Sequence, residues 1–191
     1  MIFNNVLITA TFAALLLVFM SGDWRFKLAG LAIADLLAFI AILQVWPVAL
    51  ASVKLIAGWM GIILISASRV INPENDRSQS KRSLAIFRLL IVILVWIVIT
   101  VEVDAFNEWI PISFTNLYIG LIIIAGGLIY ASVNQAMFNV IIGLLILLTG
   151  FDVIYSSLEG SALVTGIYAL IVTLLSLLNS YFPVEEREIS Q

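Results

Sequence analysis

The stretch NQAMFNVIIGLLILLTGFDVIYSS, residues 134–157, predicts a helix that crosses a membrane. It begins polar, stays apolar for about the 20 residues that a bilayer crossing requires, and then carries Asp152 shortly before Tyr155 and two serines. Gly143 and Gly150 are seven residues apart, so they fall on nearly the same helical face, where the backbone of a second helix can approach closely. We expect the other segments to assemble around this helix.

The composition is that of an integral membrane protein. Of the 191 residues, 63% are apolar and 11% are charged, and the mean hydropathy is +1.17. A soluble domain is about half apolar and about a quarter charged. The apolar runs are continuous rather than alternating, which favours helices over a β-barrel. We therefore expect an all-α, multi-pass protein of the inner (cytoplasmic) cell membrane, with residues 1–191 forming one domain.

The chain contains neither cysteine nor histidine. This removes the usual protein ligands of haem, zinc and iron–sulfur clusters, and the usual proton shuttle near neutral pH. We therefore expect no redox catalysis within this chain, no cofactor, no metal site and no catalytic activity of the chain's own. The lipid bilayer is an expected partner and nucleic acid is not.

Seven segments are long and apolar enough to span a membrane: residues 2–20, 28–45, 48–68, 83–101, 115–131, 135–156 and 162–182. Pro47 separates the second from the third. Residues 69–82 form the one long polar loop, and residues 183–191 a short charged tail. Residues 102–114 are acidic and aromatic and contain Pro111, which is typical of a loop or a short interfacial helix.

The charges support this count. With seven spans, one side of the membrane collects nearly all the cations, namely Arg25, Lys27, Arg69, Arg77, Lys81, Arg82, Arg88 and Arg187. The other side carries the acids Glu102, Asp104, Glu108 and Glu159. The positive-inside rule then places the N-terminus outside and the C-terminus in the cytoplasm. Six aromatic residues fall at span ends and are expected to be interfacial anchors: Trp24, Trp46, Trp109, Tyr130, Tyr155 and Tyr181.

Asp35 and Lys54 are charged residues inside predicted spans. A charge at the bilayer centre costs about 2.5–3.5 kcal/mol by insertion scales, so each needs a partner or water. The two lie roughly 8 Å apart in depth, a gap that a lysine stem can largely bridge, and we predict an ion pair between them. Such a pair either lines a proton or ion path or only holds two helices in register. The remaining alternative is a protonated Asp35 with no role in transport.

Asp152 lies one turn from the outer end of its span, with Thr149 and Tyr155 three residues away on the same face. It is a candidate proton-relay carboxylate, or it reaches the outer surface, or it accepts a hydrogen bond from another helix. A set of glycines predicts close helix packing rather than phosphate binding, since no P-loop or dinucleotide spacing occurs: Gly120, Gly126, Gly127, Gly143 and Gly150.

Residues 115–182 resemble the K subunit of bacterial complex I and its relatives, the C subunit of Mrp-type cation/proton antiporters and the E subunit of group 4 hydrogenases. The resemblance lies in a span LYIGLIIIAGGLIYASV, a short turn NQ, the phrase NVIIGLLILL, the loop LEGSA and a small-residue span GIYALIVTLLSLLNSYF. Residues 1–101 add four spans, as in the longer hydrogenase-type relatives. The family's second span usually has a glutamate where this chain has Leu145, and Asp152 is an acid one heptad later. The family's glutamate in the final span has no counterpart here.

The resemblance implies a small, non-redox membrane subunit that packs between larger subunits of a complex-I-like or Mrp-type cation/proton-translocating assembly and contributes to its proton path. Two other interpretations remain open. One is a structural accessory subunit of another energy-transducing membrane complex. The other is a small stand-alone ion or solute transporter that uses Asp35 and Lys54.

Overall fold

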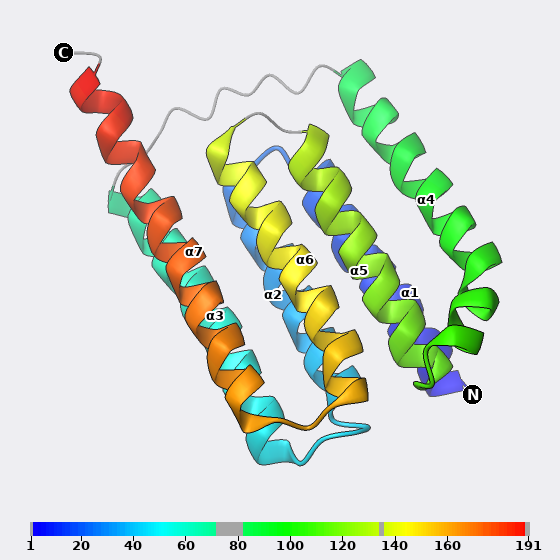
Figure 1. Cartoon of the computed structure of the whole chain (residues 1–191). Helices are drawn as coiled ribbons and strands as arrows, with labels where there is room; N and C mark the ends of the chain where they lie inside the picture. The colour runs from blue at the N-terminus through cyan, green and yellow to red at the C-terminus, as the bar shows by residue number, and fades with distance from the viewer. Residues whose placement is uncertain (1, 72–81, 134–135, 190–191) are drawn as a thin grey trace.

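The computed structural model describes residues 2–71, 82–133 and 136–189. Over these ranges every regular element is an α-helix, which confirms the all-α prediction (Figure 1). The helices are α1 (Ile2–Met20), α2 (Trp24–Ile42), α3 (Val48–Ile71), α4 (Arg82–Trp109), α5 (Phe114–Val133), α6 (Met137–Leu158) and α7 (Ala162–Ile189). Most of the predicted polar loop, with Arg77 and Lys81, lies outside the described residues, as does the turn at 134–135.

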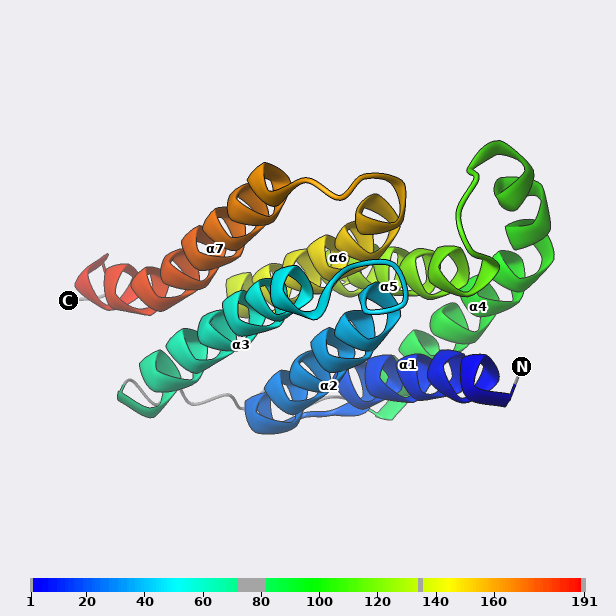
Figure 2. The same ribbon diagram turned by 90° about the horizontal axis from the view of Figure 1, so that it is seen from below.

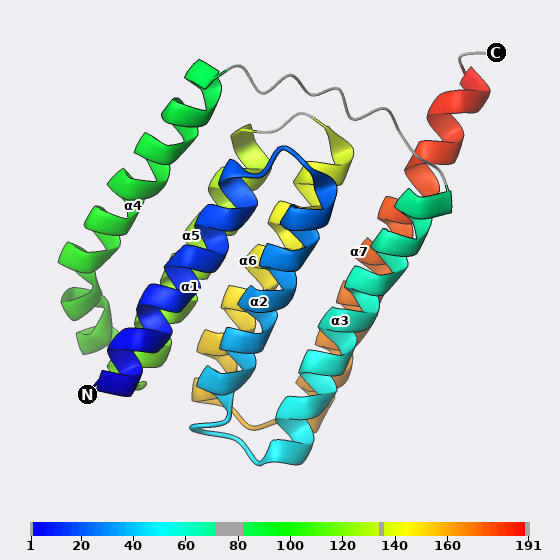
Figure 3. The same ribbon diagram turned by 180° about the vertical axis from the view of Figure 1, so that it is seen from behind.

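The helices form two layers that face each other. Helices α1, α2 and α3 lie side by side in one layer, and α5, α6 and α7 lie side by side in the other (Figures 1 and 3). Across the layers, α1 packs on α5, α2 on α6 and α3 on α7. Helix α4 adds an edge next to α5 and α1, and the view from below separates the two layers (Figure 2). Of the predicted four-span part, residues 1–101, three helices thus form one layer and α4 lies at the edge.

Six of the helices are long and apolar enough to cross a membrane, counting only the part of the chain that the structure describes. Helix α2 is not among the six because it carries Arg25, Lys27 and Asp35, but it lies between α1 and α3 and also packs on α6. Successive helices run in opposite directions (Figure 1). We call the end where α2 begins and α3 ends the basic end, after Arg25, Lys27 and Arg69, and the opposite end the acidic end, after Glu108 and Glu159.

Three helices differ from the predicted spans by four residues or more at one end. Helix α4 continues into the acidic segment predicted as a loop or a short interfacial helix and ends at Trp109, shortly before Pro111, which cannot continue a helix. Helix α2 begins four residues earlier than predicted, with Asp23 at its N-cap position, so Lys27 belongs to the helix. Helix α7 extends into the predicted tail as far as Ile189.

Glycines allow α5 and α6 to touch along their backbones. A Cβ at Gly143 would lie 2.6 Å from the backbone nitrogen of Ala131, and one at Gly150 would lie 2.8 Å from the carbonyl oxygen of Gly120. Gly127 faces the carbonyl oxygen of Gly143, 2.7 Å from where its own Cβ would be. Any larger side chain at these positions would separate the two helices. Four of the glycines predicted to pack helices therefore lie at the α5–α6 seam, namely Gly120, Gly127, Gly143 and Gly150, whereas Gly126 packs against Leu15 of α1.

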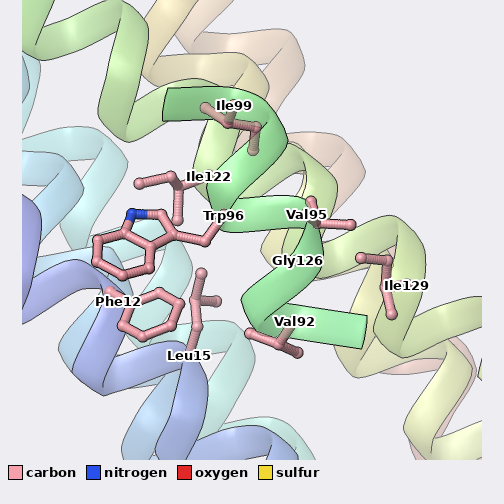
Figure 4. Close-up of a pocket in the computed structure, with 9 residues that line it drawn as sticks. All are labelled: Phe12, Leu15, Val92, Val95, Trp96, Ile99, Ile122, Gly126 and Ile129. Carbon is pink, nitrogen blue, oxygen red and sulfur yellow. The ribbon is translucent and has the colours of Figure 1, made fainter. Parts of the chain in front are cut away.

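Helix α4 joins the bundle through an aromatic contact with α1. The rings of Phe12 and Trp96 stack with centroids 4.6 Å apart. Beside them is a small cavity of about 10 Å³, lined by Phe12, Trp96, Leu15, Val92 and other residues of α1, α4 and α5 (Figure 4). No charged side chain lines this cavity, so it offers packing space but no acid–base chemistry.

Candidate functional site

Three of the buried charged side chains lie close together inside the bundle. Asp35 of α2, Lys54 of α3 and Asp152 of α6 are 7%, 4% and 4% exposed. Each lies six or seven residues from the acidic end of its helix, which corresponds to a depth of roughly 10 Å. Charges at such depth require partners, because neither lipid nor apolar side chains can solvate them.

Lys54 forms an ion pair with Asp152, and its Nζ donates a hydrogen bond to Asp152 Oδ1. The prediction that Lys54 pairs with Asp35 is therefore wrong, because the acidic partner of Lys54 is Asp152. The physical reason is the position of α6, which packs on α2 and brings a second carboxylate to the place where Lys54 points. Asp152 does not reach the outer surface: it faces the interior.

Asp35 has a different partner. The hydroxyl of Thr149, on α6, donates a hydrogen bond of 2.7 Å to Asp35 Oδ1. On its other side the carboxylate lies against α3 at Gly58, where an added Cβ would come within 2.5 Å of Asp35 Oδ2. Because only a glycine leaves this space open, α3 can pass close to the buried acid.

The three charged groups share one cavity. Asp35, Lys54 and Asp152 line it together with Thr149 and Tyr168, and its volume is about 10 Å³. A cavity needs about 10–15 Å³ to hold one water molecule. The two carboxylates therefore face a common space of about the size of one water, with the ammonium group beside it.

Aromatic rings cover the ammonium group of Lys54. Its Nζ lies 4.2 Å from the ring centroid of Trp46 and 5.9 Å from that of Tyr168, distances at which a cation is attracted to the ring face. Trp46 belongs to the segment between α2 and α3, and the backbone of Gly160 between α6 and α7 packs near its indole nitrogen. Trp46 was expected to be an interfacial anchor, but it is only 6% exposed and covers the cluster on the acidic side.

A second polar cluster lies near the basic end. Lys27 Nζ donates a 3.0 Å hydrogen bond to Asn139 Oδ1, which also accepts one of 3.1 Å from the hydroxyl of Tyr130. The guanidinium carbon of Arg69 lies 3.9 Å from the ring centroid of Phe138. Lys27, Arg69 and Tyr130 are all buried. The sequence placed the two cations in loops and Tyr130 at the interface, and these placements are wrong.

An apolar layer separates the two clusters. On α2, Lys27 and Asp35 are eight residues apart, or about 12 Å along the axis. Leu31, Ile65 and Ile142 lie at intermediate helical positions and are almost completely buried. The buried charge cluster of Asp35, Lys54 and Asp152 is therefore a compact unit in the acidic half of the bundle.

Some residues of the buried charge cluster can be recognised in the sequence, and others cannot. Asp35, Lys54 and Asp152 stand out in the sequence as charges within apolar runs, whereas Trp46 and Tyr168 carry no local sign of their contacts. Tyr155, expected on the face of Asp152, instead donates a 2.8 Å hydrogen bond to the exposed Glu159. Within the described residues, no group of three carboxylates or other metal ligands is close enough to hold an ion.

Comparison with protein-family models, with curated proteins and with solved structures finds no match to this chain.

Proposed function

We propose that this chain is a non-redox membrane subunit of a complex-I-like or Mrp-type cation/proton-translocating assembly, and that its buried charge cluster takes part in ion movement. One observation carries the proposal: two carboxylates and one ammonium group, from three different helices, share one small cavity between the helices. Buried ionisable groups inside membrane-spanning helices are costly, and they commonly mark ion or proton pathways.

The charge balance of the cluster favours uptake of one positive charge. With both acids ionised, Asp35, Lys54 and Asp152 sum to one negative charge in a buried site. Burying an uncompensated charge is strongly unfavourable, whereas one added proton or one small cation makes the cluster neutral. The site is thus suited to hold and release a single positive charge.

Exchange of the lysine between the two acids would provide a switching step. A proton that arrives at Asp152 weakens its attraction for Lys54, whose flexible stem can then turn towards Asp35 in the same cavity. A proton on Asp35 instead leaves the pair of Lys54 with Asp152 in place. In this scheme each acid is protonated in turn while the lysine remains charged.

The resemblance over residues 115–182 supports the assembly part of the proposal. It covers α5, α6 and α7, which are consecutive in one layer, and α6 contributes Asp152. The expected partners are larger antiporter-like membrane subunits. We also propose that the basic end faces the cytoplasm, since the positive-inside rule assigns it there.

Affinity purification of the tagged chain from its native membrane in a mild detergent tests the assembly. We expect mass spectrometry to find large antiporter-like subunits bound to it. Unrelated partners would contradict the proposal and favour a structural subunit of another complex. Recovery of the chain alone would also contradict it and favour a stand-alone transporter.

Ion movement by that purified assembly in proteoliposomes tests the site. We expect Asp152→Asn and Asp35→Asn each to slow it by about a hundredfold, the effect of losing a positioned proton-transfer group. Two matched changes lie outside the cluster: Glu159→Gln at an exposed acid and Asp23→Asn at the α2 N-cap position, where the aspartate side chain makes no capping hydrogen bond. Wild-type rates in both cluster variants would rule out a role of the cluster in transport.

A further inference from the structure

A groove runs along the outer face of the bundle between α2 and α3, in the half nearest the basic end. Its volume is about 360 Å³. Its walls are mostly small or apolar, with Ala29 and Ala32 on α2 and Ile62 and Val70 on α3. Small residues on α2 leave the space that a larger side chain would fill, so the seam is open to the surrounding lipid.

The groove has the length of a lipid chain segment in one leaflet. From Arg25 to Ala32 it extends seven residues along α2, or about 10 Å, while half of the hydrocarbon core is about 15 Å. At the deep end Trp59 bridges the two helices, and its Nε1 donates a 3.4 Å hydrogen bond to the carbonyl oxygen of Ala32. The groove is therefore closed towards the membrane centre and open towards the basic end.

The open end of the groove is cationic. Arg25 lines it, is exposed, and makes no ion pair with any acid of the described residues. Its guanidinium carbon lies 5.4 Å from the ring centroid of Trp24, which also lines the groove. Lys27 and Arg69 lie at the same end of α2 and α3, on the buried side. These cations attract a negative charge placed at the mouth of the groove, although the exposed acid Asp23 lies at the α2 N-cap position nearby.

We propose that this groove binds an anionic phospholipid of the leaflet at the basic end, with one acyl chain between α2 and α3 and the phosphate beside Arg25. The apolar walls match the chain, and the cationic mouth matches the headgroup. Basic sites between membrane helices on the cytoplasmic side attract anionic headgroups, and a tryptophan is favoured at that depth. This inference is independent of the proposed ion movement, because no residue of the buried charge cluster lines the groove.

The lipids retained by the purified chain test the proposal. The protein is equilibrated in micelles with equal amounts of phosphatidylglycerol and phosphatidylcholine of identical acyl chains, and bound lipids are counted by native mass spectrometry. We expect phosphatidylglycerol to be enriched about fivefold, the effect of one cation near a membrane surface.

Four variants localise the site. Arg25→Gln removes the cation and is expected to bring the enrichment down to about onefold, whereas Arg25→Lys keeps the charge and is expected to retain it. Ala32→Phe fills the groove and should lower the number of bound lipids. Ile33→Phe is the matched control, because Ile33 is an exposed residue of the same helix that does not line the groove.

Three results would overturn the proposal. The first is equal retention of both lipids by the unmodified chain. The second is unchanged enrichment in Arg25→Gln, and the third is unchanged binding in Ala32→Phe. Each variant is compared with the unmodified chain by elution volume and helical circular dichroism, so that a loss of binding is separated from a loss of fold.

Discussion

At the scale of single residues, the ammonium group of Lys54 contacts both the carboxylate of Asp152 and the ring face of Trp46. An isolated ammonium or carboxylate at this depth would be strongly unfavourable, and the pair offsets much of that cost. Asp35 lies in the same cavity and accepts a hydrogen bond from the hydroxyl of Thr149. Two acids therefore share the cavity with one lysine, which contacts one of them directly.

A double-mutant cycle tests this compensation. Lys54→Met leaves two buried carboxylates without a cation and is expected to lower the free energy of unfolding by about 3–5 kcal/mol. Lys54→Met combined with Asp152→Asn removes the pair and leaves one acid with its Thr149 donor, so we expect a smaller loss than from Lys54→Met alone. Unfolding in mixed micelles, followed by tryptophan fluorescence, measures the free energy of unfolding of the double variant and of each single variant, Lys54→Met and Asp152→Asn. A loss in the double variant equal to the sum of the two single losses would contradict the coupling.

At the scale of elements, the α5–α6 seam depends on glycines with no room for a side chain. Gly143→Ala places a methyl group against the backbone of Ala131, and we expect a loss of about 1–3 kcal/mol from overpacking. Gly166→Ala on α7 is the matched control, since nothing lies within 4 Å of its added Cβ. The control substitution is expected to leave the free energy of unfolding unchanged or to raise it by up to about 1 kcal/mol, because alanine favours a helix more than glycine does.

The same unfolding assay distinguishes the two glycine substitutions. A Gly143→Ala variant as stable as Gly166→Ala would show that α5 and α6 can separate without cost, which would contradict the close seam.

The helices could be located from the sequence because hydropathy is a local property that matches the bilayer thickness. The first span was predicted with the bounds that α1 has, Ile2–Met20. The predicted bounds are wrong where polar residues belong to a helix. Acids near the end of α4 resemble a loop but remain helical up to Trp109, and Lys27 resembles a loop cation but belongs to the buried side of α2.

At the scale of the whole molecule, the partner of Lys54 is decided by which helices are neighbours. The sequence identified the three charged residues of the cluster, since a charge inside an apolar run is conspicuous. It could not assign their pairing, because Lys54 and Asp152 are 98 positions apart and meet only when the two layers close on each other. The same holds for Tyr168 of α7, which completes the cavity from the far end of the chain.

The contact between Lys54 Nζ and the carboxyl carbon of Asp152 tests this arrangement most directly. The chain has only three lysines and five aspartates, so ¹⁵N-lysine and ¹³C-aspartate labelling in lipid bilayers suits solid-state dipolar recoupling. We predict a short nitrogen–carbon distance that disappears in Asp152→Asn and persists in Asp35→Asn. A contact that persists in Asp152→Asn and disappears in Asp35→Asn would contradict the described cluster and restore the pair of Asp35 with Lys54.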